Sequence, residues 1–153
     1  MSARAVVLAA AFSALAATPA GSFCMYDGEM YAKTTVRQEF ADSPVVVRAK
    51  VLAARDLSPW GDDGERGTLY TLAVEQSFKG NPPATITYFS ERNSGGFYVD
   101  TGATYLLFLT TYDRPVWRRF IGDAYAVNYP CGQSLPWSDI PGADRRWLEG
   151  HSR

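Results

Sequence analysis

Histidine and cysteine are scarce in this sequence of 153 residues, which has one histidine, His151, and two cysteines. The chain also lacks a Cys-x-x-Cys pair and a Gly-x-Ser-x-Gly motif. Zinc sites usually take their ligands from clustered cysteine and histidine, and nucleophilic hydrolases pair a nucleophile with a base. We therefore expect no metal site, no cofactor and no enzymatic activity, and we expect His151 to be a solvated tail residue.

Neither sign of charge is in excess, because 15 Lys and Arg residues face 16 Asp and Glu residues, a net charge of −1. Nucleic-acid-binding domains usually carry a basic patch, so this balance argues against that class of partner. Bases and aromatics interleave in Trp117–Phe120, and we interpret this segment as an edge strand with one packed aromatic and solvated arginines. The acidic cluster Asp62–Glu65 lacks the spacing of an EF-hand loop, and we expect it to be solvated.

The sequence lacks an apolar run of membrane-spanning length. Its leading run, Ala5–Ala17, has 13 residues, whereas a transmembrane helix needs about 20. A basic residue precedes this run and small residues follow it, which is typical of a secretory signal peptide. We predict that residues 1–20 are this signal, cut before Gly21, and that residues 21–153 form one domain. A cut after Ala16 is the alternative, and either cut predicts export to the periplasm or the exterior.

The two cysteines, Cys24 and Cys131, lie near opposite ends of the exported part of the chain. An even cysteine count in an oxidising compartment predicts one disulfide, with two separate thiols as the alternative. The bridge closes a loop of 131 − 24 = 107 residues, which stabilises the fold by about 4–5 kcal/mol in the chain-entropy model. It ties the N-terminal arm, which we expect to be irregular over Gly21–Tyr31, to the end of the core.

Aromatic residues are plentiful (4 Trp, 9 Tyr and 8 Phe), and 9 Pro and 13 Gly accompany them. This composition favours short strands joined by turns. Apolar patterns predict strands at Val45–Ala53, Thr68–Phe78, Ala84–Ser90, Thr104–Thr110 and Val116–Ile121, with further pairing by Ala124–Tyr129. Short helices are predicted from the N-cap Thr35 to about Ala41 and over Ala143–Glu149. Since closure removes exposed edges, we predict a mostly β fold, a five-stranded Greek-key barrel of OB type with one or two short flanking helices.

Four segments of the chain occur in a familiar order: Ala41–Val51, Tyr70–Gly80, Thr101–Phe108 and Cys131–Ser134. Together they resemble the netrin-like module of the tissue inhibitors of metalloproteinases (TIMPs) and its short bacterial relatives. The resemblance implies an OB barrel and inhibition of an extracellular zinc metalloprotease. In TIMPs the amine and carbonyl of the first cysteine bind the zinc of the protease, and Cys24 is the matching position here.

The chain departs from the TIMP pattern at two points. Tyr26 stands where the family usually has a second cysteine, so one family disulfide is missing. Chelation of zinc also requires Cys24 to be the first residue, whereas the preferred cleavage leaves Gly21–Phe23 in front of it.

We expect a protein partner and a contact surface at one end of the barrel, formed by Cys24–Tyr26 of the N-terminal arm with the loops Arg55–Gly67 and Glu91–Gly96. The candidate contact residues are Cys24, Met25, Tyr26, Trp60, Asp62 and Asp63. The resemblance suggests an extracellular zinc metalloprotease as the partner. A scaffold or accessory module for another protein is the alternative, and an oligonucleotide-binding OB domain is the third. We expect a monomer with no nucleic-acid partner and no stable membrane span.

Overall fold

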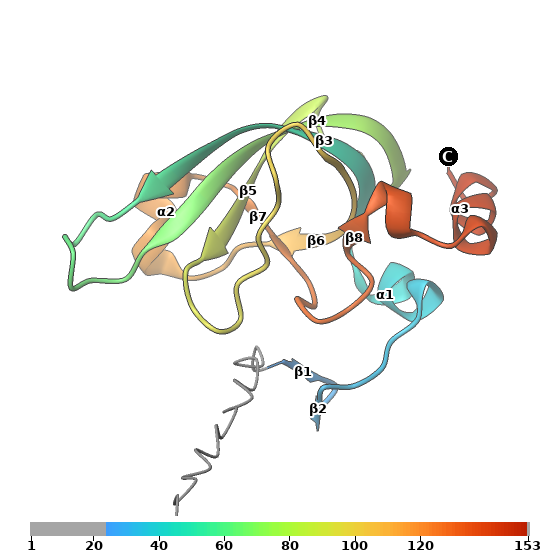
Figure 1. Ribbon diagram of the computed structural model, residues 1–153, viewed down its shortest axis with the longest axis horizontal. Coiled ribbons are helices and arrows are strands. Elements are labelled where there is room, and N and C mark those ends of the chain that lie inside the picture. Colours follow the sequence, from blue (N-terminus) through green and yellow to red (C-terminus); the bar gives the residue numbers. More distant parts are fainter. Residues whose placement is uncertain (1–23, 153) are drawn as a thin grey trace, which may run out of the picture.

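The computed structural model describes residues 24–152, and the predicted signal peptide, residues 1–20, lies outside them (Figure 1). Strands predominate, and the short helices lie around them. In chain order the elements are β1 (Met25–Tyr26), β2 (Glu29–Met30), α1 (Val36–Asp42), β3 (Val45–Leu57), β4 (Gly67–Lys79), β5 (Thr85–Glu91), β6 (Thr104–Thr111), α2 (Pro115–Ile121), β7 (Tyr125–Val127), β8 (Leu135–Pro136), a 3-10 turn at Trp137–Asp139, and α3 (Gly142–Glu149).

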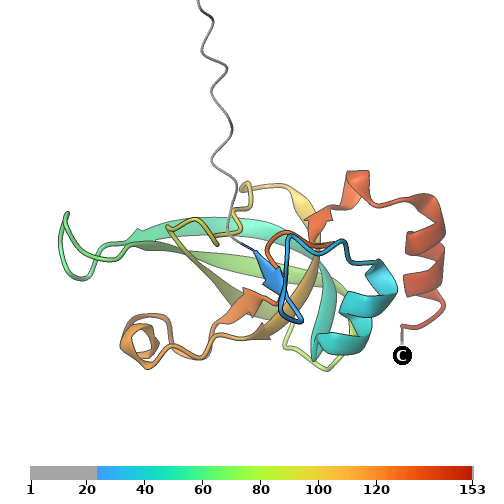
Figure 2. The ribbon, with the colours of Figure 1, turned by 90° about the horizontal axis from the view of Figure 1, so that it is seen from below.

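The main sheet closes on itself to form a barrel of five strands (Figures 1 and 2). The order around the barrel is β3-β4-β5-β7-β6, and β6 pairs again with β3. Neighbouring strands are antiparallel except β5 and β7, which are parallel, and β8 pairs with the start of β6. This closed mixed barrel with short flanking helices confirms the predicted OB-type fold.

Alternate residues of the strands fill the barrel interior. Val45 and Val47 of β3 point inward together with Leu107 of β6, as the apolar patterns predicted. The intervening residues of β6, Leu106 and Phe108, are also fully buried, but they belong to a second apolar layer outside the barrel. The continuous apolar run in β6 therefore reflects burial on both faces of the strand.

Helices α1 and α3 cover the outer apolar layer. The predicted capping box of α1 is confirmed, because the Thr35 side chain accepts from the Gln38 backbone N–H at 3.2 Å while the Gln38 side chain accepts from the Thr35 N–H at 2.9 Å. Val36 of α1 and Leu148 of α3 pack in one cluster with Phe108. These two helices thus seal the side of the barrel to which Leu106 and Phe108 of β6 point.

The prediction of a strand at Val116–Ile121 is wrong. These residues belong to α2, and the fifth barrel strand is β7, inside the stretch Ala124–Tyr129. Pro115 stands in the first turn of the helix, where its missing N–H has no intrahelical partner to lose. Trp117 and Ile121 are four residues apart and both buried, which places them on one side of a helix. The four-residue spacing of Trp117 and Ile121 indicated a helix, whereas the two-residue alternation of this segment wrongly predicted a strand.

Strands β3 and β4 are longer than predicted, since β3 continues to Leu57 instead of ending at Ala53. Beyond Lys50, β3 no longer pairs with β6 and pairs only with β4. The connecting loop is consequently reduced to residues 58–66 and lies at the far end of this extension (Figure 1). Within residues 24–152, no helix has the length and apolar character needed to cross a membrane.

Candidate functional site

Cys24 and Cys131 form a disulfide, as predicted, with their Cα atoms 6.0 Å apart. The bond joins residues separated by 107 positions and fastens the start of β1 to the segment that follows β7. Cys24 is buried, with 2% of its surface exposed. The N-terminal arm is therefore attached to the barrel at the first residue that the structure describes.

The arm forms a small hairpin, β1–β2, where the sequence predicted an irregular segment. Asp27 and Gly28 make its two-residue turn at φ 48° and 79°, the left-handed backbone that a type I′ turn requires. Met25 pairs with Met30 across the hairpin. The Tyr31 N–H donates to the Cys24 carbonyl oxygen at 2.9 Å and closes its base. The Asp-Gly dipeptide was the sequence signal for this hairpin.

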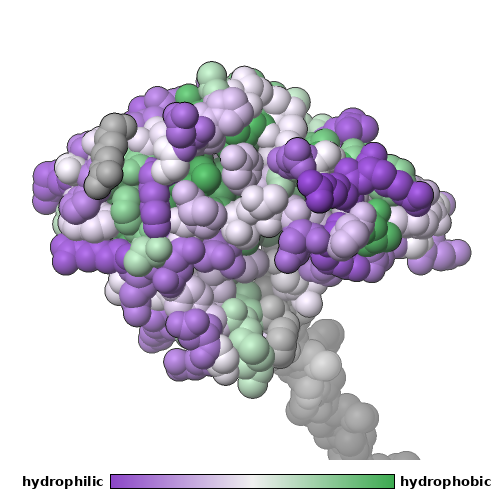
Figure 3. Space-filling model, turned by 180° about the vertical axis from the view of Figure 1, so that it is seen from behind, coloured by the Kyte–Doolittle hydropathy of each residue, from purple (hydrophilic) through white to green (hydrophobic). Residues whose placement is uncertain are grey.

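The hairpin exposes three large apolar side chains. Met25 is 54% exposed, Met30 57% and Tyr31 54%. Because Met25 and Met30 are direct partners in the register, their side chains project from the same face. Figure 3 shows a hydrophobic strip at the lower edge of the molecule, beside the grey part of the chain. Contiguous exposed apolar groups of this kind mark interaction surfaces, whereas single ones carry no such meaning.

Tyr26 holds the hairpin against the body of the protein. Its ring lies 5.0 Å from that of Tyr129, and its hydroxyl donates to the Asp42 carboxylate at the end of α1. This hydrogen bond raises the pKa of Tyr26 to about 12. Tyr129 is itself buried and donates its hydroxyl to the Ala32 carbonyl oxygen at 3.1 Å. Together with the disulfide, these contacts fix the orientation of the hairpin.

Glu39 of α1 is a fully buried carboxylate that joins the helix to the segment after Cys131. Its Oε1 accepts from the Gln133 backbone N–H at 2.8 Å and from the Thr34 hydroxyl. Burial raises the pKa of Glu39, and its Oε2 has no hydrogen-bond partner among residues 24–152. A β-carbon at Gly132 would lie 1.9 Å from Oε1, so the close approach of the chain here requires glycine.

Glu39 is expected to make stability depend on pH. Its pKa is raised in the folded state, so between the ordinary Glu pKa and the raised one the folded chain binds more protons than the unfolded chain. The free energy of unfolding therefore decreases as pH rises through this window. The free energy of unfolding is measured by chemical denaturation at a series of pH values. We expect its decrease with pH to disappear in Glu39→Gln and to remain in the exposed control Glu29→Gln. Identical pH profiles for all three proteins would contradict the assignment.

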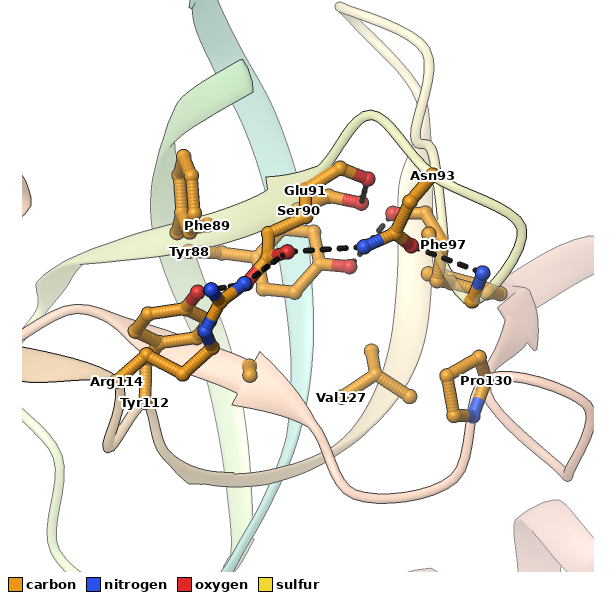
Figure 4. Close-up of a pocket in the computed structure, with 13 residues that line it drawn as sticks. Tyr88, Phe89, Ser90, Glu91, Asn93, Phe97, Tyr112, Arg114, Val127 and Pro130 are labelled. Carbon is orange, nitrogen blue, oxygen red and sulfur yellow. Dashed lines mark hydrogen bonds and ion pairs between the residues drawn. The ribbon is translucent and has the colours of Figure 1, made fainter. Parts of the chain in front are cut away.

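A cleft opens between β5 and β7, where the barrel is held by a single residue pair. It contains a cavity of about 390 Å³ whose walls include Phe97 of the loop after β5, Val127 of β7 and Pro130 (Figure 4). Pro130 directly precedes Cys131, so the cleft adjoins the disulfide that holds the hairpin. Figures 1 and 2 likewise show the start of β1 beside the loop that follows β5.

Glu91 is the charged centre of this cleft. Its carboxylate accepts hydrogen bonds from Arg114 at 2.6 and 2.7 Å, from Asn93 at 2.9 Å and from the Tyr112 hydroxyl (Figure 4). Arg114 also bonds to Glu65 at 3.0 Å. Hydrogen bonds to these two carboxylates raise the pKa of Arg114, and burial raises the pKa of Tyr112. Both oxygens of Glu91 are engaged by donors of the protein itself, so this network holds the walls of the cleft in place.

The loop at residues 58–66 carries the remaining candidates, away from the hairpin (Figure 1). Trp60 packs edge-on against Trp117 of α2, with the ring centroids 4.9 Å apart. Asp62 accepts hydrogen bonds from Arg66, and Asp63 is exposed. Trp60 therefore attaches this loop to α2, and 37% of its surface stays exposed.

The structure thus divides the predicted contact residues into two groups. Cys24, Met25 and Tyr26 lie beside the loop that follows β5, whereas Trp60, Asp62 and Asp63 lie on the other loop. Sequence reasoning missed Met30 and Tyr31, the other two exposed apolar residues of the hairpin and its base. It also missed Glu39–Gln133 and Glu91–Arg114, because these hydrogen-bonded pairs are 94 and 23 residues apart and leave no local pattern.

Helix α2 covers the surface on which OB barrels commonly bind ligands. That surface is the outer face of the second and third strands, here β4 and β5, between two loops. Leu69 and Phe89 are paired on this face and lie in one apolar cluster with Trp117, whose ring is 4.6 Å from that of Phe89. Phe89 and Trp117 are buried, so their rings are packed and are not available for base stacking.

Among the described residues, no three or more His, Cys, Asp or Glu side chains are grouped to hold a metal ion. Comparisons with protein-family models and with curated protein sequences find no match to this chain.

Proposed function

We propose that this chain is an exported, non-enzymatic module that binds another protein through the β1–β2 hairpin. The observation that carries the proposal is the exposure of Met25, Met30 and Tyr31 on a hairpin fastened by a disulfide. Tyrosine and methionine are enriched in protein interfaces, and flexible methionine side chains adapt to a partner's surface. The disulfide supports export, because such bonds persist mainly in oxidising compartments.

Restraint of the hairpin favours binding. The disulfide and the Tyr26–Asp42 hydrogen bond order the hairpin before a partner arrives. An ordered segment loses less conformational entropy on binding than a free one. The adjoining cleft, of about 390 Å³, provides a recess in which one side chain of the partner can be buried.

The resemblance to TIMPs makes an extracellular zinc metalloprotease the first partner to test. In our proposal, side chains of the hairpin make the contact, and Cys24 does not chelate the zinc of the protease. Its carbonyl oxygen already accepts a hydrogen bond from Tyr31, and Cys24 is buried. A scaffold or accessory role with a different protein partner would use the same surface.

Titration against zinc metalloproteases tests this proposal. Purified disulfide-bonded protein is added to a panel of extracellular zinc metalloproteases, and the Kd is measured for each one that is inhibited. Replacing Met25 and Met30 together by serine removes two apolar contacts and is expected to weaken binding about 10- to 100-fold. Leu52→Ser is the matched control, because Leu52 is 49% exposed on β3, and it is expected to bind like the wild type.

Two results would count against the proposal. If no protease in the panel is bound or inhibited, the metalloprotease is excluded as the partner class. If a protease is bound with the same Kd by the wild type and by the double methionine variant, the hairpin is not the contact surface.

A further inference from the structure

A second cavity, of about 390 Å³, lies where the end of α1, the end of β4 and the segment after α3 meet. Figure 1 shows α1 and α3 together at the right of the barrel. Phe40 lines the cavity along with Ser77, Lys79 and His151, and Phe78, which also borders it, is buried with 2% of its surface exposed. None of the described residues that line it is acidic.

Lys79 presents a fixed ammonium group to this cavity. Its Nζ donates to the backbone carbonyl oxygens of Phe40 at 2.6 Å and of Ala41 at 2.8 Å, in the last turn of α1. The same nitrogen lies 5.3 Å from the centre of the Phe40 ring. Because an ammonium group has three N–H donors, one remains for a ligand. No carboxylate of residues 24–152 forms a salt bridge with Lys79.

His151 is exposed, as predicted for a tail residue, but its imidazole ring is held in place. The ring stacks on Trp147 at 4.1 Å and lies 6.2 Å from Phe40. Its Nδ1 is 2.7 Å from the Trp147 carbonyl oxygen. A carbonyl oxygen only accepts, so Nδ1 carries the hydrogen in this contact.

We infer that this cavity binds a small carboxylic acid with an apolar body. The carboxylate is placed to accept from Lys79, and the apolar body packs on the Phe40 ring beside the His151 ring. The volume is at the lower end of the range of small-molecule sites, which suits a ligand of about ten non-hydrogen atoms. The inference is independent of protein binding by the hairpin.

Three probes applied to the full disulfide-bonded protein test this inference: 3-phenylpropionate, its uncharged amide, and inorganic phosphate. The amide shifts of Ser77–Gly80 in NMR spectra are expected to move and saturate with 3-phenylpropionate. Binding of the amide, which lacks the charge, and of phosphate, which lacks the apolar body, is expected to be at least about tenfold weaker. No saturation by 3-phenylpropionate up to about 10 mM, or equal binding of the acid and its amide, would overturn the inference.

Variants locate the site. Lys79→Met is expected to weaken binding of 3-phenylpropionate about tenfold or more, and Lys50→Met, at an exposed lysine of β3, is expected to have no effect. Since Lys79 also holds the last turn of α1, His151→Ala provides a second test that leaves the barrel intact, and it is expected to weaken binding several-fold. Wild-type affinity in His151→Ala, or in a folded Lys79→Met, would overturn the assignment.

Discussion

Replacing Trp117 by alanine is expected to lower the free energy of unfolding by about 3–5 kcal/mol. Trp117 is fully buried, and its ring lies 4.6 Å from Phe89 and 4.9 Å from Trp60. It therefore connects α2 to the outer face of the barrel and to the loop at residues 58–66. Alanine would leave a cavity among aromatic rings that the surrounding strands cannot collapse to fill.

Urea unfolding of the wild type and the Trp117→Ala protein measures this loss. Trp147→Ala, at a half-buried tryptophan of α3, is the matched control and is expected to lose less. The comparison of these two losses also distinguishes the helix observed at Val116–Ile121 from the strand predicted there. On the edge strand predicted for Val116–Ile121, Trp117 would share one face with the solvated side chain of Arg119. A loss below about 1 kcal/mol would contradict the packing of α2.

Reduction of the Cys24–Cys131 disulfide is expected to lower the free energy of unfolding by about 4–5 kcal/mol, since it opens a loop of 107 residues. It is also expected to release the hairpin while the barrel remains folded. Amide hydrogen exchange should then accelerate over residues 25–31 and stay slow in the buried strand β6.

The double variant Cys24→Ser, Cys131→Ser controls for effects of the reductant. It is expected to have the stability of the reduced wild type and to be unaffected by reductant. Unchanged stability on reduction of the wild type, or exchange that is already fast at residues 25–31 in the oxidised protein, would show that the bond does not order the hairpin.

The barrel could be predicted from the sequence because its strands carry strong local patterns. The alternation of Val45, Val47, Ala49 and Val51 and the apolar run of β6 correspond to the interior and to the doubly buried strand. The Thr35–Gln38 capping box likewise marks the start of α1. The error at α2 arose because six residues with a proline before them fit both a strand and two turns of helix, and only packing against Phe89 decides between them.

The candidate site was harder to predict because it depends on contacts between distant residues. The cysteine count predicted the disulfide. The placement of the hairpin, however, depends on the Tyr26–Asp42 and Tyr129–Ala32 hydrogen bonds, and no local sequence pattern predicts these bonds. The exposure of Met25 and Met30 is likewise a tertiary property, since an apolar residue in a short polar segment is as easily buried as exposed.

Site-specific photocrosslinking to a bound metalloprotease tests the central claim most directly. A benzophenone side chain is introduced in turn at the exposed apolar positions Met25, Met30, Tyr31, Leu52 and Val116 of the disulfide-bonded protein. Contact through the hairpin predicts crosslinks from positions 25, 30 and 31 and none from positions 52 and 116. Crosslinks from position 52 or 116, with none from the hairpin, would contradict it.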